Sequence, residues 1–198
     1  MTLVGDALWV AAYGVAIWVG YREATYAIPL PAICLNVTWE LLFTFWRPPR
    51  TAIKRALYSS WFLLDLVILA QAFVYAPVAG QLGVLRAHPI GVIGLGLLAS
   101  FGAHLWLYRR FARPYHVAFG LNLVMSILFV EMYFARPDGR GLSLAVAWLK
   151  FGGTALISLA NLYRFRGRLR EQPALTAFMA GIFFFDVSYL ALLHGLFH

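Results

Sequence analysis

The stretch AIPLPAICLNVTWELLFTFW, residues 27–46, is apolar almost throughout and yet carries Glu40 in its second half. An α-helix rises about 1.5 Å per residue, so about 20 apolar residues cross the hydrocarbon core of a bilayer. The stretch is therefore predicted to span a membrane. A charged side chain inside such a span costs at least about 2.5 kcal/mol, which makes Glu40 a candidate functional residue. Asn36 lies one helical turn before Glu40, and we interpret its amide as a partner of that acid rather than as a glycosylation site.

The composition extends this prediction to the whole chain. Of its 198 residues, 62% are hydrophobic and only 12% are charged, whereas soluble domains contain about 25% charged residues. The sequence therefore predicts an all-α integral membrane protein, a single domain over residues 1–198 built as a bundle of seven transmembrane helices. The six apolar stretches besides residues 27–46 lie at 3–20, 57–77, 88–108, 115–134, 142–163 and 174–196.

The basic residues, which give a net charge of +8 at pH 7, indicate an orientation. Most lie in the connections after the second, fourth and sixth predicted helices: Arg47, Arg50, Lys54, Arg55, Arg109, Arg110, Arg113, Arg164, Arg166, Arg168 and Arg170. The connections on the other side hold only Arg22, Arg86, Arg136 and Arg140. Cytoplasmic loops carry the excess of Lys and Arg, so we predict a cytoplasmic N-terminus and a C-terminus outside. We interpret the charge as setting topology in a lipid bilayer, expected to be a bacterial cytoplasmic membrane, and expect no nucleic-acid partner.

Asp65 and Asp186 are two further acids deep inside predicted spans. Counted from the cytoplasmic helix ends, Glu40, Asp65 and Asp186 lie about 9, 12 and 18 Å deep, so we expect their carboxyl groups to share one cavity. Glu131 falls near the outer end of its helix and is interpreted as a boundary residue. Aromatic or amide side chains accompany the three acids at helical spacing and are candidates for binding a substrate: Asn36, Trp39, Phe43, Trp61 and Tyr189.

Other predicted helices carry milder polar stripes, such as Asn122 with Ser126 and Lys150 with Thr154. Polar side chains at these spacings commonly form hydrogen bonds between packed transmembrane helices. We interpret most of them in this way, His104 included. Asn122 is in addition counted among the candidate substrate-binding residues.

Several kinds of chemistry lack their motifs in this sequence. It contains no DDxxD pattern for a metal-held diphosphate, no HExxH, no Gly-rich phosphate loop and no GxSxG, and its last apolar stretch has no lysine for a retinal Schiff base. Cys34 is the only cysteine, which excludes an intrachain disulfide or a cysteine-based metal site. We therefore expect neither a metal nor an organic cofactor.

What remains is a carboxylic acid in an apolar, aromatic interior. Burial disfavours the charged form of a carboxyl group, so that such a group can stay protonated and act as a general acid. Trp, Tyr and Phe rings around it can stabilise a carbocation by cation–π attraction. The residues thus favour a proton-initiated cyclisation of a polyene.

Two motifs carry a resemblance to a known family. The seven-span layout, Asn36-Val37-Thr38-Trp39-Glu40 and Asp186-Val187-Ser188-Tyr189 resemble the membrane-bound terpene cyclases of the fungal pyripyropene and paspaline pathways. They are also similar to bacterial relatives that cyclise farnesylated indoles in drimentine-type pathways. The resemblance implies that Glu40 and Asp186 are catalytic acids that protonate an epoxide or a terminal alkene. Asp65 lacks such a motif and is assigned a supporting catalytic role.

The resemblance also implies the substrate and the pathway. We expect a hydrophobic prenylated small molecule, an aromatic or indole compound that is farnesylated, and a product of meroterpenoid or indole-terpenoid biosynthesis. Because the diphosphate would be lost in an earlier prenyl transfer, we expect an upstream prenyltransferase as the pathway partner.

Two other interpretations stay open at this point. Intramembrane acids with amide neighbours are equally typical of a proton relay, so a small seven-helix proton-coupled transporter is the main alternative. A non-catalytic sensor or assembly partner is the other. Which of Glu40 and Asp186 delivers the proton is open as well, because two carboxyl groups in one site can share protons.

Overall fold

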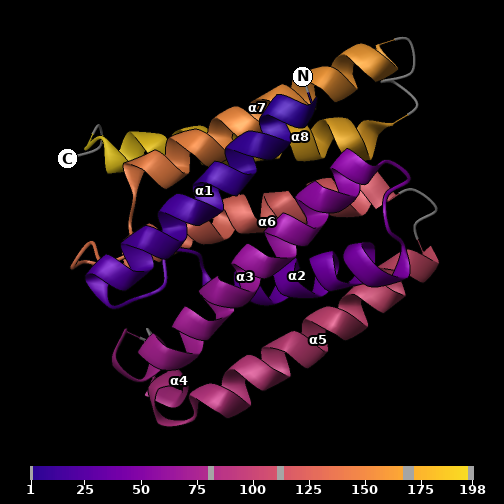
Figure 1. Cartoon of the computed structure of the whole chain (residues 1–198). Helices are drawn as coiled ribbons and strands as arrows, with labels where there is room; N and C mark the ends of the chain where they lie inside the picture. The colour runs from indigo at the N-terminus through magenta and orange to yellow at the C-terminus, as the bar shows by residue number, and fades with distance from the viewer. Residues whose placement is uncertain (1, 80–82, 111–113, 167–171, 196–198) are drawn as a thin grey trace.

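The computed structural model describes residues 2–79, 83–110, 114–166 and 172–195. Within these ranges all regular secondary structure is helical (Figure 1). In chain order the elements are α1 (Thr2–Glu23), α2 (Leu30–Leu41), the π-helical turn η1 (Leu42–Trp46), α3 (Ala52–Ala79), α4 (Gly83–Ala87), α5 (Pro89–Arg110), α6 (Pro114–Ala135), α7 (Leu144–Phe165) and α8 (Pro173–Leu193).

Six of these helices are long and apolar enough to cross a membrane: α1, α3, α5, α6, α7 and α8. The segment Leu30–Trp46, which joins α2 to η1, is apolar but shorter. Each predicted apolar stretch therefore coincides with a helix, whereas the seventh span stays a prediction. The short α4 is an addition that the sequence analysis does not predict. When the shorter segment Leu30–Trp46 is counted with them, these helices run in alternating directions along the chain (Figure 1), as expected of a chain that crosses a bilayer repeatedly.

Two local features shape the segment that carries Glu40. Pro29 has an extended ψ of 133° and is the N-cap residue, so α2 begins at Leu30 rather than at the predicted residue 27. At the other end the Arg47 N–H donates to the Leu42 carbonyl oxygen at 2.9 Å, which closes the π-helical turn. A π turn holds more residues than an α turn. Side chains beyond it rotate away from the face of Glu40, and Trp46 is 66% exposed.

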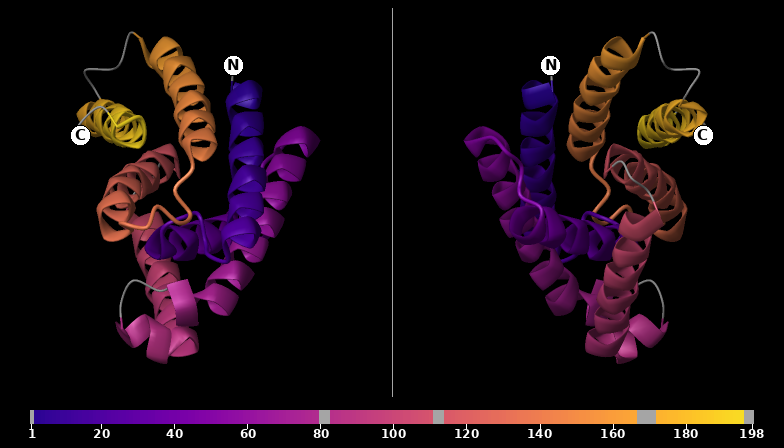
Figure 2. Two further views of the ribbon diagram at one scale, coloured as in Figure 1. Left: turned by 90° about the vertical axis from the view of Figure 1, so that its left-hand side faces the viewer. Right: turned by 90° about the vertical axis from the view of Figure 1, so that its right-hand side faces the viewer.

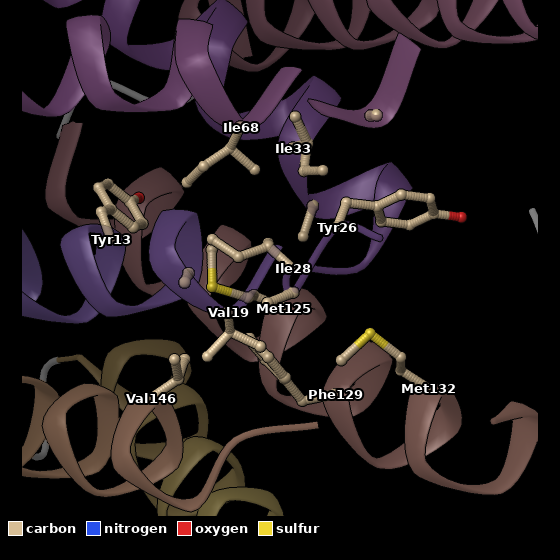
Figure 3. Close-up of a cluster of buried hydrophobic side chains, with 14 of the residues drawn as sticks. Tyr13, Val19, Tyr26, Ile28, Ile33, Ile68, Met125, Phe129, Met132 and Val146 are labelled. Carbon is tan, nitrogen blue, oxygen red and sulfur yellow. The ribbon is translucent and has the colours of Figure 1, made fainter. Parts of the chain in front are cut away.

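The helices pack in a layered order that places α2 at the centre of the bundle. α1 packs against α3 and α7, α2 against α3, α5 and α6, and α8 against α6 and α7. α7 and α8 lie toward one edge and α4 and α5 toward the opposite edge (Figure 2). Apolar side chains from α1, α2, α3, α6 and α7 meet in the main buried cluster (Figure 3), which includes Tyr13, Ile33, Ile68, Met125 and Val146.

A buried arginine ties the connection between α1 and α2 to the one between α6 and α7. The Arg136 side chain donates to the Tyr26 carbonyl oxygen (2.8 Å) and to the Arg140 carbonyl oxygen (2.9 Å). Burial lowers the pKa of the Arg136 guanidinium, and the Tyr26 ring that it covers at 4.7 Å acts in the opposite direction. Gly141 has φ +77°, and an added Cβ would collide with the Arg136 side chain. These contacts fix the entry of the chain into α2.

Gly5 and Gly153 let α1 and α7 approach each other closely. A Cβ at Gly5 would lie 2.8 Å from the Gly153 carbonyl oxygen, and one at Gly153 would lie 3.0 Å from the Gly5 carbonyl oxygen. Small residues at such contacts are how transmembrane helices pack closely. We expect Gly153→Val to lower the free energy of unfolding by about 1–3 kcal/mol because of overpacking, measured by denaturant titration in bicelles.

Gly14 provides the matched control for this prediction. A Cβ at Gly14 would meet nothing within 4 Å, so Gly14→Val should not lower the free energy of unfolding, because valine has a slightly higher helix propensity than glycine. Equal losses at the two positions would contradict the role assigned to the contact between Gly5 and Gly153.

Candidate active site

A cavity of about 140 Å³ lies between α1, α2, α3, α6 and α7. Five residues that the sequence analysis selects line it: Asn36, Trp39, Glu40, Trp61 and Asn122. The other lining residues are Trp9, Tyr13, Ala118, Leu121, Met125 and Ile157. A carboxyl group, two amides and a tyrosine hydroxyl thus meet apolar and aromatic side chains in one space.

Glu40 enters this cavity from α2, together with Asn36 one turn earlier. The Glu40 side chain is buried, and its Oε2 accepts no hydrogen bond of standard geometry from the described residues. The Asn36 amide donates to the Tyr13 hydroxyl at 2.9 Å, and that hydroxyl is itself a hydrogen-bonding neighbour of Glu40. The structure therefore corrects the expected partner of Asn36: Tyr13 of α1 connects the amide to the acid.

Asp65 of α3 lies beside Glu40, close enough for the two carboxyl groups to interact electrostatically. Asp65 is fully buried, and neither of its carboxyl oxygens accepts a hydrogen bond of standard geometry from the part of the chain that the structure describes. Two adjacent carboxyl groups in a medium of low polarity repel each other when both are charged. The pair can therefore hold one proton in common, and Glu40 is the member that lines the cavity.

An aromatic cluster stands beside this pair. Trp39 packs on Phe43 with ring centroids 4.1 Å apart and stacks on Tyr108 at 5.9 Å. Tyr58 extends the cluster to Trp61, whose ring centroid is 5.0 Å away. Phe43 thus supports the wall of the cavity through Trp39 rather than lining it. These rings present electron-rich faces next to an acid.

Asp186 occupies a different part of the molecule. It lines a second cavity of about 440 Å³ between α7 and α8. The Lys150 ammonium of α7 donates to Asp186 Oδ1 at 2.5 Å and to the Ser126 hydroxyl at 2.7 Å. Both partners of this ion pair are buried.

The structure thus brings Glu40 and Asp65 together and keeps Asp186 apart, unlike the expectation that the three share one cavity. That expectation depended on depth along the helix axes alone, whereas in the structure α6 and α7 separate α8 from α2 and α3. Tyr189 also lies outside both cavities. Its ring packs on Phe129 at 5.2 Å in the buried cluster.

The polar stripes have the interhelical role that the sequence indicates. The Thr38 hydroxyl lies 3.0 Å from His104 Nδ1, which confirms the structural interpretation of His104. The Asn122 amide donates to the Thr154 hydroxyl at 3.1 Å, while Asn122 also lines the smaller cavity.

Sequence reasoning does not select Trp9 and Tyr13 of α1, which line the cavity, and does not identify Lys150 as the partner of Asp186. Trp9 and Tyr13 are spaced by one helical turn, the same aromatic pattern that selects residues near the acids. Lys150 could be found from the rule that intramembrane charges pair with one another, because it is the one lysine inside a predicted span.

The described residues of this region contain no group of side chains that could bind a metal ion. Among the residues that the structure describes, no three His, Cys, Asp or Glu side chains gather to hold a metal ion. The prediction that the protein needs no metal or organic cofactor stays a prediction.

Comparisons with known proteins give the family. Residues 1–196 match the Pyr4-like transmembrane terpene cyclases. The Pyr4-family terpene cyclase mfmH of Annulohypoxylon moriforme is 24% identical over 188 residues, which cover 92% of this chain and 77% of that protein. Asnovolin H synthase nvfL of Aspergillus novofumigatus is 26% identical over 192 residues, covering 91% of this chain and 78% of the relative. Terpene cyclase pyr4 of Aspergillus fumigatus is 25% identical over 150 residues, covering 74% of this chain and 62% of the relative. No solved structure is significantly similar to this chain.

These matches favour a cyclase over the proton-coupled transporter and confirm the family indicated by the motifs at Glu40 and Asp186. The three relatives are fungal proteins and lend no support to a bacterial cytoplasmic membrane, which stays a prediction. Because the family match covers residues 1–196 and the helices are long and apolar, the chain is an integral membrane protein and belongs to the Pyr4-like transmembrane terpene cyclases.

Proposed function

We propose that this protein cyclises the isoprenoid tail of a prenylated aromatic or indole substrate, and that the Glu40–Asp65 pair supplies the proton that starts the reaction. The observation that carries this proposal is the position of the pair, buried and adjacent, at an aromatic-lined cavity. Farnesyl is the prenyl group we expect.

Glu40 delivers the proton because it lines the cavity, and Asp65 lies behind it as the second carboxyl group. In the resting pair each carboxyl group holds its proton, since buried charges, and above all two of like sign, would be costly. After transfer to the substrate, the pair is left with one negative charge and one proton, which the two groups can share, beside the Trp39 and Trp61 rings. The negative charge and the aromatic rings both stabilise a carbocation in the cavity.

The reaction then proceeds without any further reagent. The Glu40 O–H bond breaks and a C–H bond forms at the terminal double bond, or the proton opens a terminal epoxide. The electron pair of the next double bond closes a ring, and the cation moves along the tail. Loss of a proton from a carbon next to the last cation forms a new double bond. The product is an isomer of the substrate with fewer double bonds.

The surroundings of the site fit a substrate that arrives from the membrane. We propose that Leu30–Trp46 crosses the bilayer as the seventh span, which gives a cytoplasmic N-terminus and a C-terminus outside under the charge distribution of the loops. An upstream prenyltransferase would release the prenylated substrate into the same bilayer. No cofactor is required, because each step is a proton transfer or a ring closure.

The test is to incubate membranes that contain the protein with farnesylated and geranylgeranylated indoles and phenols, and with their terminal epoxides. We expect at least one of them to be converted into an isomer of unchanged mass with fewer double bonds, identified by mass spectrometry and NMR. The substrate that is converted, with or without a terminal epoxide, shows whether the protein protonates an epoxide or an alkene. Recovery of every substrate unchanged would overturn the proposal.

A further inference from the structure

A further cavity, of about 200 Å³, lies between η1 and the last turns of α5. Six residues line it, three from each side: Leu42, Trp46, Arg47, Leu105, Tyr108 and Arg109. None of them lines the cavity of Glu40 or the cavity of Asp186. The proposed cyclisation therefore leaves this space without a role.

Arg47 and Arg109 bring two positive charges from different elements to this one cavity. Among the ion pairs that the described residues form, none includes either arginine. The Arg47 guanidinium lies 5.4 Å from the centre of the Tyr108 ring, within the range of cation–π attraction, so it is held at the cavity wall. Two like charges around one space repel each other, and an anion between them removes that repulsion. The two unpaired guanidinium groups therefore indicate an anion-binding site.

The other lining residues indicate what kind of anion fits. The planar fork of a guanidinium matches the oxygens of a phosphate group, and two arginines can hold one phosphate from two sides. Leu42, Leu105 and Trp46 add an apolar surface to the same cavity. A phosphate that carries an apolar chain uses both parts of this lining, whereas inorganic phosphate uses only the arginines.

The surface of α5 continues this apolar lining away from Arg109. Leu98, Gly102, Leu105 and Arg109 follow one another at intervals of three or four residues, which places them on one face of the helix. Leu98 is 71% exposed, and a Cβ at Gly102 would meet nothing within 4 Å. α5 lies at an edge of the bundle (Figure 2). A hydrocarbon chain whose phosphate lies at Arg109 can therefore run along this face.

The depth of the cavity agrees with the position of lipid headgroups. Trp46, at its rim, is largely exposed, and tryptophan is enriched where the membrane meets water. Arg47 and Arg109 both lie in connections that the charge distribution assigns to the cytoplasmic side. Basic pockets between transmembrane helices on that side bind anionic lipid headgroups.

We propose that this cavity binds one anionic phospholipid. Arg47 and Arg109 hold its phosphate group, and an acyl chain lies on the exposed face of α5 that includes Leu98 and Leu105. Tyr108 also stacks on Trp39, which lines the Glu40 cavity, so the bound lipid packs beside the aromatic cluster of the active site. This inference goes beyond the proposed function and does not rest on it, because lipid binding can be measured without a substrate.

The test is to titrate the purified full chain in detergent micelles with phosphatidylglycerol, and in parallel with phosphatidylcholine of the same acyl chains. Native mass spectrometry counts the lipids that each protein molecule retains. We expect one phosphatidylglycerol to be retained, with an affinity at least about fivefold higher than that of phosphatidylcholine, whose choline cation cancels the charge of the phosphate.

Arg47→Gln and Arg109→Gln should each lower the affinity for phosphatidylglycerol about fivefold, the effect of one basic side chain at an anionic headgroup. Arg109→Lys should lose less than Arg109→Gln, because it keeps the positive charge. Arg50→Gln and Arg110→Gln are the matched controls: both arginines are exposed and lie in the same two connections, but neither lines the cavity. They should leave the affinity nearly unchanged.

Three results would overturn the lipid site. Equal losses in the Arg50 and Arg110 variants would show a general attraction to the basic surface, and equal retention of the two lipids would show that headgroup charge is not recognised. Displacement of phosphatidylglycerol by excess inorganic phosphate would assign the arginines to a free phosphate. All three leave the proposed cyclase activity standing, and a protein that converts no substrate can still bind the lipid.

Discussion

Glu40→Gln is expected to reduce substrate consumption by about 10²–10⁴-fold, the usual contribution of a general acid. Glutamine keeps the size of the side chain and its position in the cavity, but it has no carboxyl proton to give to an alkene or epoxide. Asp65 cannot replace it, because Asp65 is fully buried and does not line the cavity. The measurement is the initial rate of substrate loss in membranes that contain equal amounts of protein.

Glu131→Gln is the matched control, the same substitution at an exposed acid on α6. It should react at the rate of the unsubstituted protein. Asp65→Asn separates the two members of the pair: Glu40 still has its own proton to give, so activity should fall by less than in Glu40→Gln. Full activity of Glu40→Gln would remove the proposed proton donor, even if cyclisation itself were observed.

The position of Glu40 beside Asp65 shows what the sequence can predict. Both residues lie at similar depth on consecutive helices, and consecutive antiparallel helices are usually neighbours. The aromatic spacing around Glu40 likewise selects Trp39 and Trp61, which line the cavity. For these residues, helical periodicity and depth contain enough information.

Asp186 shows where that information ends. The depth of a residue along its helix axis does not show which helices are neighbours or how each helix is rotated about its axis. Both the choice of neighbours and the rotation follow from side-chain packing. The close contact of Gly5 and Gly153 brings α7 against α1, and α6 and α7 then stand between α8 and the Glu40 region. The π-helical turn after Leu41 is a second feature that the sequence analysis does not predict. Beyond this turn, α-helical spacing no longer shows which side chains share the face of Glu40.

Lys150→Met is the second substitution expected to have a large effect, this time on stability. It leaves the Asp186 carboxylate buried without a counter-ion, and breaking a buried ion pair in this way costs about 3–5 kcal/mol. The free energy of unfolding can be measured by denaturant titration of the protein in bicelles. Arg22→Met, at the ion pair with Glu23 whose two side chains are 59% and 23% exposed, should cost only about 0–1 kcal/mol.

The double variant Lys150→Met/Asp186→Leu separates charge from packing. Replacing a whole buried ion pair by apolar residues of similar volume is often neutral or stabilising, so the double variant should recover most of the stability that Lys150→Met loses. That recovery requires Asp186 to be ionised in the native protein, because a neutral carboxyl group would lose little with its cation. If Lys150→Met cost no more than Arg22→Met, Asp186 would not be a carboxylate in the folded protein. A stability measurement therefore checks, without any substrate, whether Asp186 is charged in the folded protein.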